Sequence, residues 1–125
     1  MYVHPQTAPE ATPLPGIRHA TWAAGAEGLS QLSLWHQSIA PGGATPPHRH
    51  GCDELVLCSA GRGELHVGDA VHHFGAGDTV TIPRGELHQI VSVGEVPLLV
   101  TAVFGATPVD VQLPDGTLLA LPWRS

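Results

Sequence analysis

Residues 42–61 read GGATPPHRHGCDELVLCSAG, and this stretch decides the fold. His48 and His50 are separated by one residue, and in an extended strand alternate side chains share a face. The two imidazoles are therefore predicted to point the same way. Glu54 follows across a turn at the start of the next predicted strand and supplies a carboxylate.

A second stretch, residues 77–92, reads GDTVTIPRGELHQIVS and contributes His88 after the turn Pro83-Arg84-Gly85. A strand paired near the first stretch would bring His88 to the other two histidines. Three imidazoles and one carboxylate at one point form a cage for a divalent transition metal ion. The alternative interpretation is that these residues are merely polar groups that line a cavity.

Length and composition limit the class of protein. The chain has 125 residues, of which 42% are hydrophobic and 13% charged, as expected of one folded domain. No apolar run approaches the roughly 20 residues that cross a bilayer, and the N-terminus lacks a basic-then-hydrophobic signal pattern. We therefore expect a cytoplasmic protein.

The charge balance disfavours several partners. Eleven acidic residues stand against five basic ones, all of them arginines, and the net charge is −6. Nucleic acids, anionic membranes and heavily phosphorylated substrates are disfavoured because few cations can receive their phosphates. With no lysine in the chain, Schiff-base catalysis through a lysine is excluded.

Short apolar runs between glycines and prolines predict an all-β sandwich or barrel with very little helix. Residues 1–16, with Pro5, Pro9, Pro13 and Pro15, are predicted to form an extended arm, and residues 17–125 one domain. The residues Gly68-Asp69-Ala70 separate the apolar runs at 65–67 and 71–74 and predict a tight hairpin there. Strands are predicted at 29–40, 55–58, 65–67, 71–74, 79–82, 88–93 and 98–104, with weaker ones at 109–113 and 117–121.

The two histidine stretches resemble the paired motifs of the cupins, in particular the small single-domain members. The family's closing asparagine is replaced here by Ser92. The resemblance implies a double-stranded β-helix, or jelly roll, and implies that His48, His50, Glu54 and His88 are the metal ligands. The fixed positions that match are Gly42, His48, His50, Glu54 and Gly61, followed by Gly77, Pro83, Gly85 and His88.

The ligand set leaves the metal open, since iron, manganese, nickel, copper, cobalt and zinc all accept three nitrogens and one oxygen. Four protein ligands on a six-coordinate ion leave two positions for a substrate or dioxygen. The first functional hypothesis is a metal-dependent enzyme on a small, largely uncharged organic molecule, with dioxygenase-like chemistry first and isomerase or cyclase chemistry next. The second is a non-catalytic metal and small-molecule binding or sensing protein. The third is a cupin that is retained only as a scaffold.

Other side chains are candidates for supporting roles. His36 lies on the strand that enters the first motif and is predicted as an acid or base if its face points inward. The opposite parity would instead direct Trp35, Gln37 and Ile39 into the pocket. Cys52, His72 and Arg84 remain open: each is either functional or a buried, surface or turn residue.

The resemblance also implies a homodimer formed by packing the outer faces of two barrels, with exchanged N-terminal strands. Leu55 and Leu57, on the outward side of their predicted strand, are compatible with that arrangement.

Overall fold

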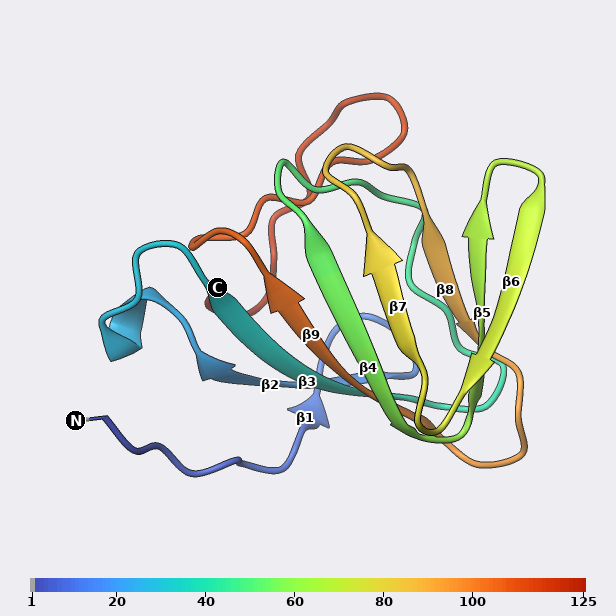
Figure 1. Cartoon of the computed structure of the whole chain (residues 1–125), viewed down its shortest axis with the longest axis horizontal. Coiled ribbons are helices and arrows are strands. Elements are labelled where there is room, and N and C mark those ends of the chain that lie inside the picture. Colours follow the sequence, from blue (N-terminus) through green and yellow to red (C-terminus); the bar gives the residue numbers. More distant parts are fainter. Residues whose placement is uncertain (1) are drawn as a thin grey trace.

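The structure, a computed structural model that describes residues 2–125, contains two antiparallel sheets and almost no helix. Figure 1 shows the larger sheet in front of the C-terminal segment and the smaller sheet beside it. Six strands form the larger sheet in the order β1-β2-β3-β9-β4-β7, and three form the smaller in the order β6-β5-β8. The bounds are β1 (Glu10–Ala11), β2 (Ile17–Ala23), β3 (Ser33–Ile39), β4 (Glu54–Ala60), β5 (Arg62–Val67), β6 (Ala70–Gly75), β7 (Thr79–Ile82), β8 (Gln89–Ser92) and β9 (Leu98–Phe104).

This architecture confirms the predicted all-β jelly roll. The runs at 79–82 and 98–104 become β7 and β9 with those bounds, and residues 62–75 form the β5–β6 hairpin. Strict alternation of buried and partly buried residues along β9 reflects a strand with one face on the core and one face away from it.

Three expectations need correction. The strand expected at 29–40 is shorter, and β2 was missed because its apolar residues do not alternate cleanly. Residues 109–121 make only isolated bridges, of Gln112 with Arg49 and with Leu118, instead of strands. The only helix among the described residues is the 3-10 turn η1 (Gly25–Glu27), so no helix there could cross a membrane.

The proline-rich arm follows the edge of the larger sheet. Its residues 10–11 form β1, which pairs with β2, and prolines elsewhere keep the rest out of the sheet. The indole of Trp22 donates a hydrogen bond to the carbonyl of Thr7, 2.9 Å away. The arm is thus attached to β2 and its outer part is exposed, as the left edge of Figure 1 shows.

Two motif glycines occupy turns that other residues would strain. Gly42 and Gly61 have φ angles of 80° and 81°, in the left-handed region that glycine adopts without steric cost. A Cβ on Gly61 would also lie 2.6 Å from the carbonyl oxygen of Pro97. Both ends of the first motif are therefore tight turns that favour glycine.

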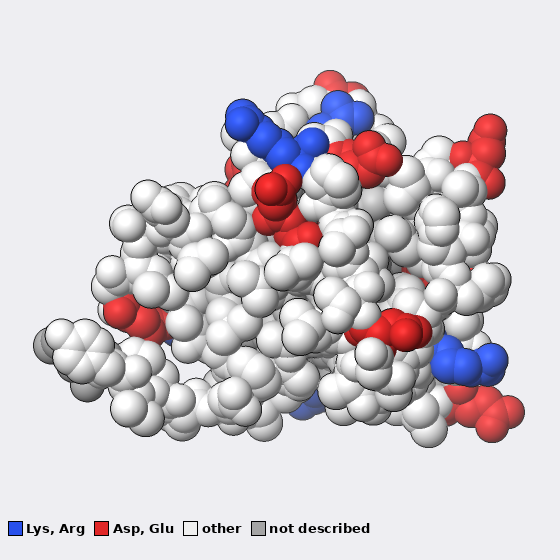
Figure 2. Space-filling view, in the orientation of Figure 1, with Lys and Arg blue, Asp and Glu red and all other residues white. Residues whose placement is uncertain are grey.

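The core lies between the two sheets and continues into the cavity described below. Its most completely buried side chains include Phe104, Ile39, Leu98 and Val56, all on the inward faces of the larger sheet. The outside carries few charges: Figure 2 shows a largely uncharged face with acidic and basic groups gathered mainly toward its margins.

Candidate metal centre

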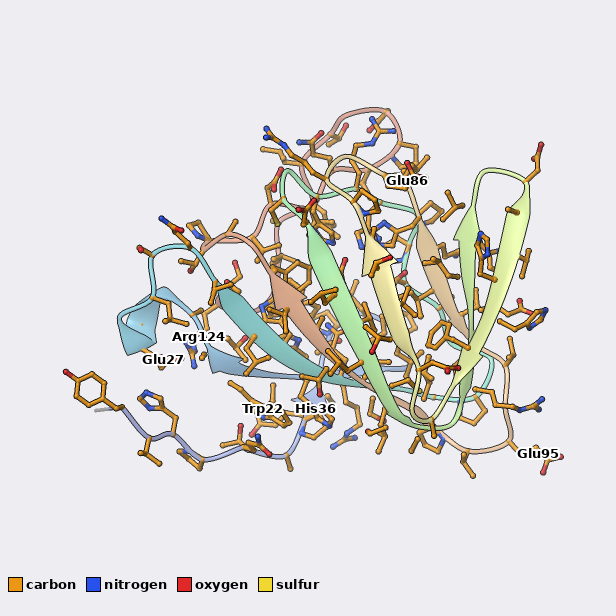
Figure 3. All side chains as sticks on the ribbon, viewed as in Figure 1. Trp22, Glu27, His36, Glu86, Glu95 and Arg124 are labelled. Carbon is orange, nitrogen blue, oxygen red and sulfur yellow. The ribbon has the colours of Figure 1, made fainter. Side chains whose placement is uncertain are left out.

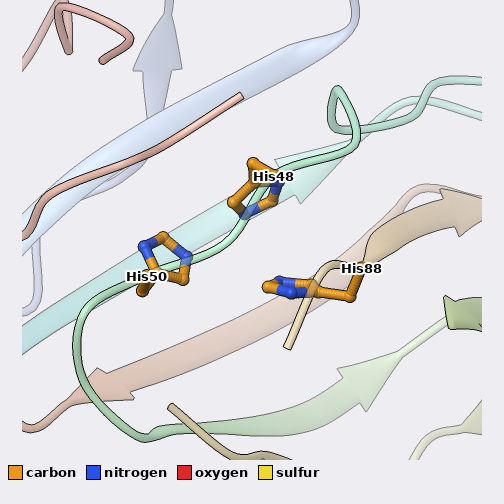
Figure 4. Close-up of side chains that lie close together, drawn as sticks. All are labelled: His48, His50 and His88. Atoms are coloured by element: carbon orange, nitrogen blue, oxygen red, sulfur yellow. The ribbon is translucent and has the colours of Figure 1, made fainter. Parts of the chain in front are cut away.

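Three buried histidines meet at one end of the space between the sheets. His48 and His50 come from the segment before β4, and His88 directly precedes β8. One ligand nitrogen of each lies within 4.8 Å of the others, and Figure 4 shows the three rings grouped together. The structure therefore brings together the three histidines that the two motifs contribute.

Backbone hydrogen bonds fix the two segments against each other. The amide of His48 donates to the carbonyl of His88 and the amide of His88 donates back, both at 2.9 Å. The amide of Gly85 donates to the carbonyl of His50, also at 2.9 Å. The motifs are thus neighbouring strand-like segments, which is why residues 38 to 40 positions apart share a site.

Each imidazole is oriented through its Nδ1 atom. Nδ1 of His48 lies 2.6 Å from the carbonyl oxygen of Pro46, and Nδ1 of His88 lies 2.9 Å from that of Glu86. Nδ1 of His50 lies 2.7 Å from the carbonyl oxygen of Asp110. A carbonyl only accepts, so each Nδ1 carries a proton, and the neutral form of each ring presents the lone pair of Nε2. Metal-bound histidines are oriented in this way.

Glu54, the first residue of β4, supplies the carboxylate. Its Oε1 lies 3.3 Å from Nε2 of His50 and 3.5 Å from Nε2 of His88. These three buried atoms have no hydrogen-bond partner of acceptable geometry. Unsatisfied buried acceptors are costly in a folded protein, and a cation between them would satisfy all three. The residues present therefore fit a divalent transition metal ion.

The electrostatics of the metal-free cluster follow from burial and mutual contact. Burial lowers the pKa of His48 to about 4, and the neighbouring imidazoles of His88 and His50 add to this effect. Burial alone would raise the pKa of Glu54, but the adjacent His50 and His88 outweigh burial and hold it at about 2. Burial by itself would lower the pKa of His50. The neighbouring Glu54 carboxylate has the larger, opposite effect, so the pKa of His50 is raised. The cluster thus keeps an ionised carboxylate among imidazoles.

A cavity of about 60 Å³ opens beside the cluster. Its wall is mainly apolar and comes from the inward faces of both sheets and from the last part of the chain. The four residues of the cluster are the only titratable side chains among the described residues that line it. Away from them, the polar residues of the wall are Gln37 and Thr45, and the indoles of Trp35 and Trp123 also line it.

The C-terminal segment (residues 109–125) covers one side of this cavity. Leu119, Leu121 and Trp123 contribute to the wall, and the carbonyl of Asp110 orients His50 as described. Arg124 pairs with Glu27 at 2.7 Å, near the left of Figure 3, and so ties the end of the segment to η1. The segment therefore closes the cavity and also supports one of the histidines.

His36, the predicted acid or base, does not reach the cavity. Strand β3 directs Trp35, Gln37 and Ile39 inward, which is the opposite parity. The His36 ring stacks on Trp22 at 4.5 Å, and its Nδ1 lies 3.1 Å from Oγ1 of Thr101 (Figure 3). The condition for the predicted role, a His36 side chain that points inward, is therefore not met. The sequence alone did not fix which face of the strand is buried.

The remaining candidates lie outside the cavity wall. Cys52 is buried beside the cluster, and burial raises the pKa of its thiol. His72 is exposed on β6, and Arg84 is exposed in the turn before His88, where its amide donates to Oδ1 of Asp53 at 2.8 Å. No contact of these three side chains with the cavity is found in residues 2–125.

Two residues with a place at the site were missed from the sequence. The carbonyl of Asp110 holds His50 across 60 positions of sequence, and no motif signals a backbone contact of that range. His19, which the sequence did not single out, is buried against Trp35 and Trp123. His19 lies on the buried face of β2. Because β2 was not predicted as a strand, the sequence did not indicate that this residue is buried.

Known proteins share this sequence pattern. The profile of the Cupin domain family matches residues 35–104. Auxin-binding protein 1 of Arabidopsis thaliana is 30% identical over 107 residues, which cover 78% of this chain and 54% of that protein. The chain thus spans about half the length of this curated relative.

Solved structures share the fold. The polyketide cyclase RemF of Streptomyces resistomycificus superposes with a TM-score of 0.71 at 25% identity, over 83% of this chain and 78% of that one. A cupin-2 domain protein of Rhodospirillum rubrum superposes with a TM-score of 0.70 at 28% identity, over 90% of this chain and 73% of that one.

Proposed function

The chain belongs to the cupin family, and from this premise we propose that it holds one divalent transition metal ion and binds a small organic molecule beside that ion. Nε2 of His48, His50 and His88 and the carboxylate of Glu54 would hold the metal. Such an ion, when bound, supplies a Lewis-acid or redox centre that receives an oxygen atom of the ligand.

The composition of the cavity wall carries this proposal. The wall has charged or titratable groups only at the metal cluster, and elsewhere it is almost entirely apolar. An apolar wall with a few convergent polar groups is typical of sites for small organic molecules. The ligand is therefore mostly uncharged and apolar, with an oxygen directed at the cluster.

The size of the cavity limits the ligand. Its volume of about 60 Å³ is well below the 300–1,000 Å³ that is usual for sites of drug-sized ligands. A molecule of a few non-hydrogen atoms fits the closed form. A molecule with an aromatic ring fits only when the C-terminal segment moves outward, because Leu121 and Trp123 occupy that side.

Reversible binding, rather than turnover, is the function that the side chains favour. General acid–base catalysis needs a titratable group within reach of the substrate, and among residues 2–125 the wall offers none beyond the cluster itself. The similarity to a protein named for auxin binding is consistent with a binding role. The sensing or storage hypothesis is thus our first candidate.

Turnover by a metal-dependent enzyme is the second candidate. The likeness to a polyketide cyclase favours Lewis-acid cyclase or isomerase chemistry, in which the apolar wall would fold the substrate and exclude water. Four protein ligands leave two positions on a six-coordinate ion for that substrate. The dioxygenase-like hypothesis rests on the family resemblance alone and ranks after these two.

One experiment tests the proposal and separates the two candidates. Elemental analysis of protein purified without chelator or nickel resin is expected to find about one equivalent of a transition metal, which His48→Ala loses and His72→Ala keeps. The metal-loaded protein is then incubated with small carboxylates, phenols and enols. Saturable, metal-dependent binding without a product supports the binding role, whereas product formation supports the enzyme. A protein that takes up no metal even on reconstitution contradicts both.

Pairing of two copies belongs to the same proposal. The outward side of β4 exposes 43% of Leu55 and 45% of Leu57, and Leu32 lies near them with 48% exposed. An apolar patch on a sheet face is a suitable surface for a second copy. Light scattering of the purified protein is expected to give twice the mass of the chain, and Leu57→Glu is expected to give the monomer. A wild-type monomer contradicts this part.

A further inference from the structure

Among residues 2–125, Gln37 is the only side-chain amide in the cavity wall, and a chain of hydrogen bonds runs from it to the C-terminal segment. Its Nε2 lies 3.0 Å from Nδ1 of His19. Nε2 of His19 lies 2.7 Å from Oγ1 of Thr21, which lies 2.7 Å from the carbonyl oxygen of Arg124. These contacts join β3, β2 and the C-terminal segment behind the wall of the cavity.

The direction of every bond in this chain follows from its last acceptor. The carbonyl of Arg124 can only accept, so the hydroxyl of Thr21 donates its one proton to that carbonyl. Oγ1 of Thr21 must then accept from His19, which places the ring proton on Nε2. Nδ1 of neutral His19 is therefore an acceptor, and it receives the hydrogen bond from the amide of Gln37.

The surroundings of His19 keep its ring neutral. The residue is only 7% exposed, and its ring lies parallel to that of Trp123 at 3.9 Å and edge-on to that of Trp35 at 5.2 Å. Burial, assisted by the positive charge of Arg124, lowers the pKa of His19 to about 4. At neutral pH the ring therefore has one proton and one lone pair, as the hydrogen-bond directions require.

The orientation of Gln37 is thereby fixed. An isolated glutamine can turn its amide either way, but here a half-turn would place Oε1 against the lone pair of Nδ1 on His19. The amide nitrogen stays on His19, and Oε1 has no hydrogen-bond partner within residues 2–125. His19 accepts one of the two N–H groups of this amide. Oε1 is therefore a free acceptor whose position is fixed by the chain of hydrogen bonds.

We infer that Gln37 determines ligand specificity: its Oε1 accepts a hydrogen bond from a hydroxyl or N–H group of the ligand. The inference rests on the proposed function, because it assumes that a ligand oxygen meets the metal cluster. Ligands with a donor group away from the metal are selected. Ligands with only an acceptor there, such as an ether oxygen or a second carboxylate, bind less tightly because they cannot donate to Oε1.

The strand register places Gln37 apart from the cluster. Gln37 pairs with Val100 of β9, whereas Glu54 pairs with Phe104 of the same strand. Four residues of a strand correspond to roughly 13 Å along the sheet, part of which the side chains themselves span. One ligand with an oxygen at one end and a donor group at the other can therefore meet both.

The hydrogen-bond chain is tested first, in metal-free protein. Nitrogen-15 NMR at neutral pH is expected to show that Nε2 of His19 is protonated and that Nδ1 is not. Thr21→Val keeps the shape of the threonine but removes its hydroxyl, so the preference for the Nε2 proton is expected to weaken. A wild-type His19 protonated on Nδ1 overturns the inference, whatever the outcome for the metal.

Specificity is tested on zinc-loaded protein with two probes, 3-hydroxypropionate and 3-methoxypropionate, which have few enough non-hydrogen atoms for the closed cavity. They share a carboxylate for the metal and differ in whether the distal oxygen can donate. Calorimetry is expected to give about tenfold or tighter binding of the hydroxy compound. Gln37→Met, which has no comparable acceptor, is expected to bring the ratio of the two dissociation constants close to one.

The matched control is Gln31→Met, at an exposed glutamine outside the cavity, which is expected to keep the wild-type ratio. Equal binding of both probes by the wild type, a preference that survives Gln37→Met, or no binding of either at millimolar concentration overturns the inference while zinc is held. Failure to hold zinc is a failure of the proposed function instead, and the NMR result still decides the direction of the hydrogen bonds.

Discussion

The molecule buries histidines in two regions, one in the wall of the cavity and one behind that wall, and the ring nitrogens are used differently in the two. In the metal cluster, Nδ1 of His50 is bound to a carbonyl while its Nε2 has no hydrogen-bond partner, and His88 repeats the pattern. At His19 both nitrogens have partners, Gln37 and Thr21. Burial is common to both regions. A candidate metal ligand differs from a structural histidine because its Nε2 has no hydrogen-bond partner and lies close to other acceptors that also have none.

Proton affinity alone would not separate the two regions. Burial lowers the pKa of both His48 and His19 to about 4. The second cause differs: neighbouring imidazoles act on His48, whereas the charge of Arg124 acts on His19. Two histidines with the same pKa can therefore have unrelated roles, and the hydrogen-bond partners carry the functional information.

The largest expected effect comes from removing a cluster histidine. Zinc at a thousand times its dissociation constant should raise the free energy of unfolding of the wild type by about 4 kcal/mol, because it binds only the folded state. His88→Ala should lose nearly all of this increase, and His19→Gln should retain it. Urea unfolding with and without zinc measures both. Equal losses in the two variants would mean that the regions do not differ as described.

The next effect concerns pH and belongs to His19. The folded protein holds its pKa at about 4, and the unfolded chain has the ordinary value of 6.5. The unfolded chain therefore takes up the proton first, so stability is complete above pH 6.5 and falls as the pH is lowered toward 4. The free energy of unfolding lost through His19 over this range is on the order of 3 kcal/mol, since one pKa unit corresponds to about 1.4 kcal/mol.

Urea unfolding of metal-free protein across this pH range measures that contribution. His48 acts in the same window, so the wild-type slope should fall only in part in His19→Gln. Adding zinc should suppress the contribution of His48 and leave that of His19. A His19→Gln variant with an unchanged slope would show that His19 is not buried in its neutral form.

The sequence predicted the cluster better than it predicted the rest of the cavity. Glycines at turns and histidines at fixed spacing are local features, so Gly42, His48 and His88 could be placed from their motifs. The parity of β3 is decided by which face packs on the opposite sheet, and no local feature shows this. The sequence therefore left open whether His36 or Gln37 faces the cavity. The partners of His19 and His50 lie far away in sequence, in an irregular segment for which strands were predicted.

The smallest expected effect is that of His36→Ala, and it tests the assignment of the two faces of β3. His36 stacks on Trp22 outside the cavity, so its removal costs at most the stacking and one hydrogen bond, about 1 kcal/mol. Zinc affinity should be unchanged, because no atom of His36 lies in the wall around the cluster. Urea unfolding and zinc titration, with Thr101→Val as the matched loss of the hydrogen-bond partner, measure the two quantities. A tenfold loss of zinc affinity in His36→Ala, with Thr101→Val unaffected, would show that the inner and outer faces of this strand have been assigned the wrong way round.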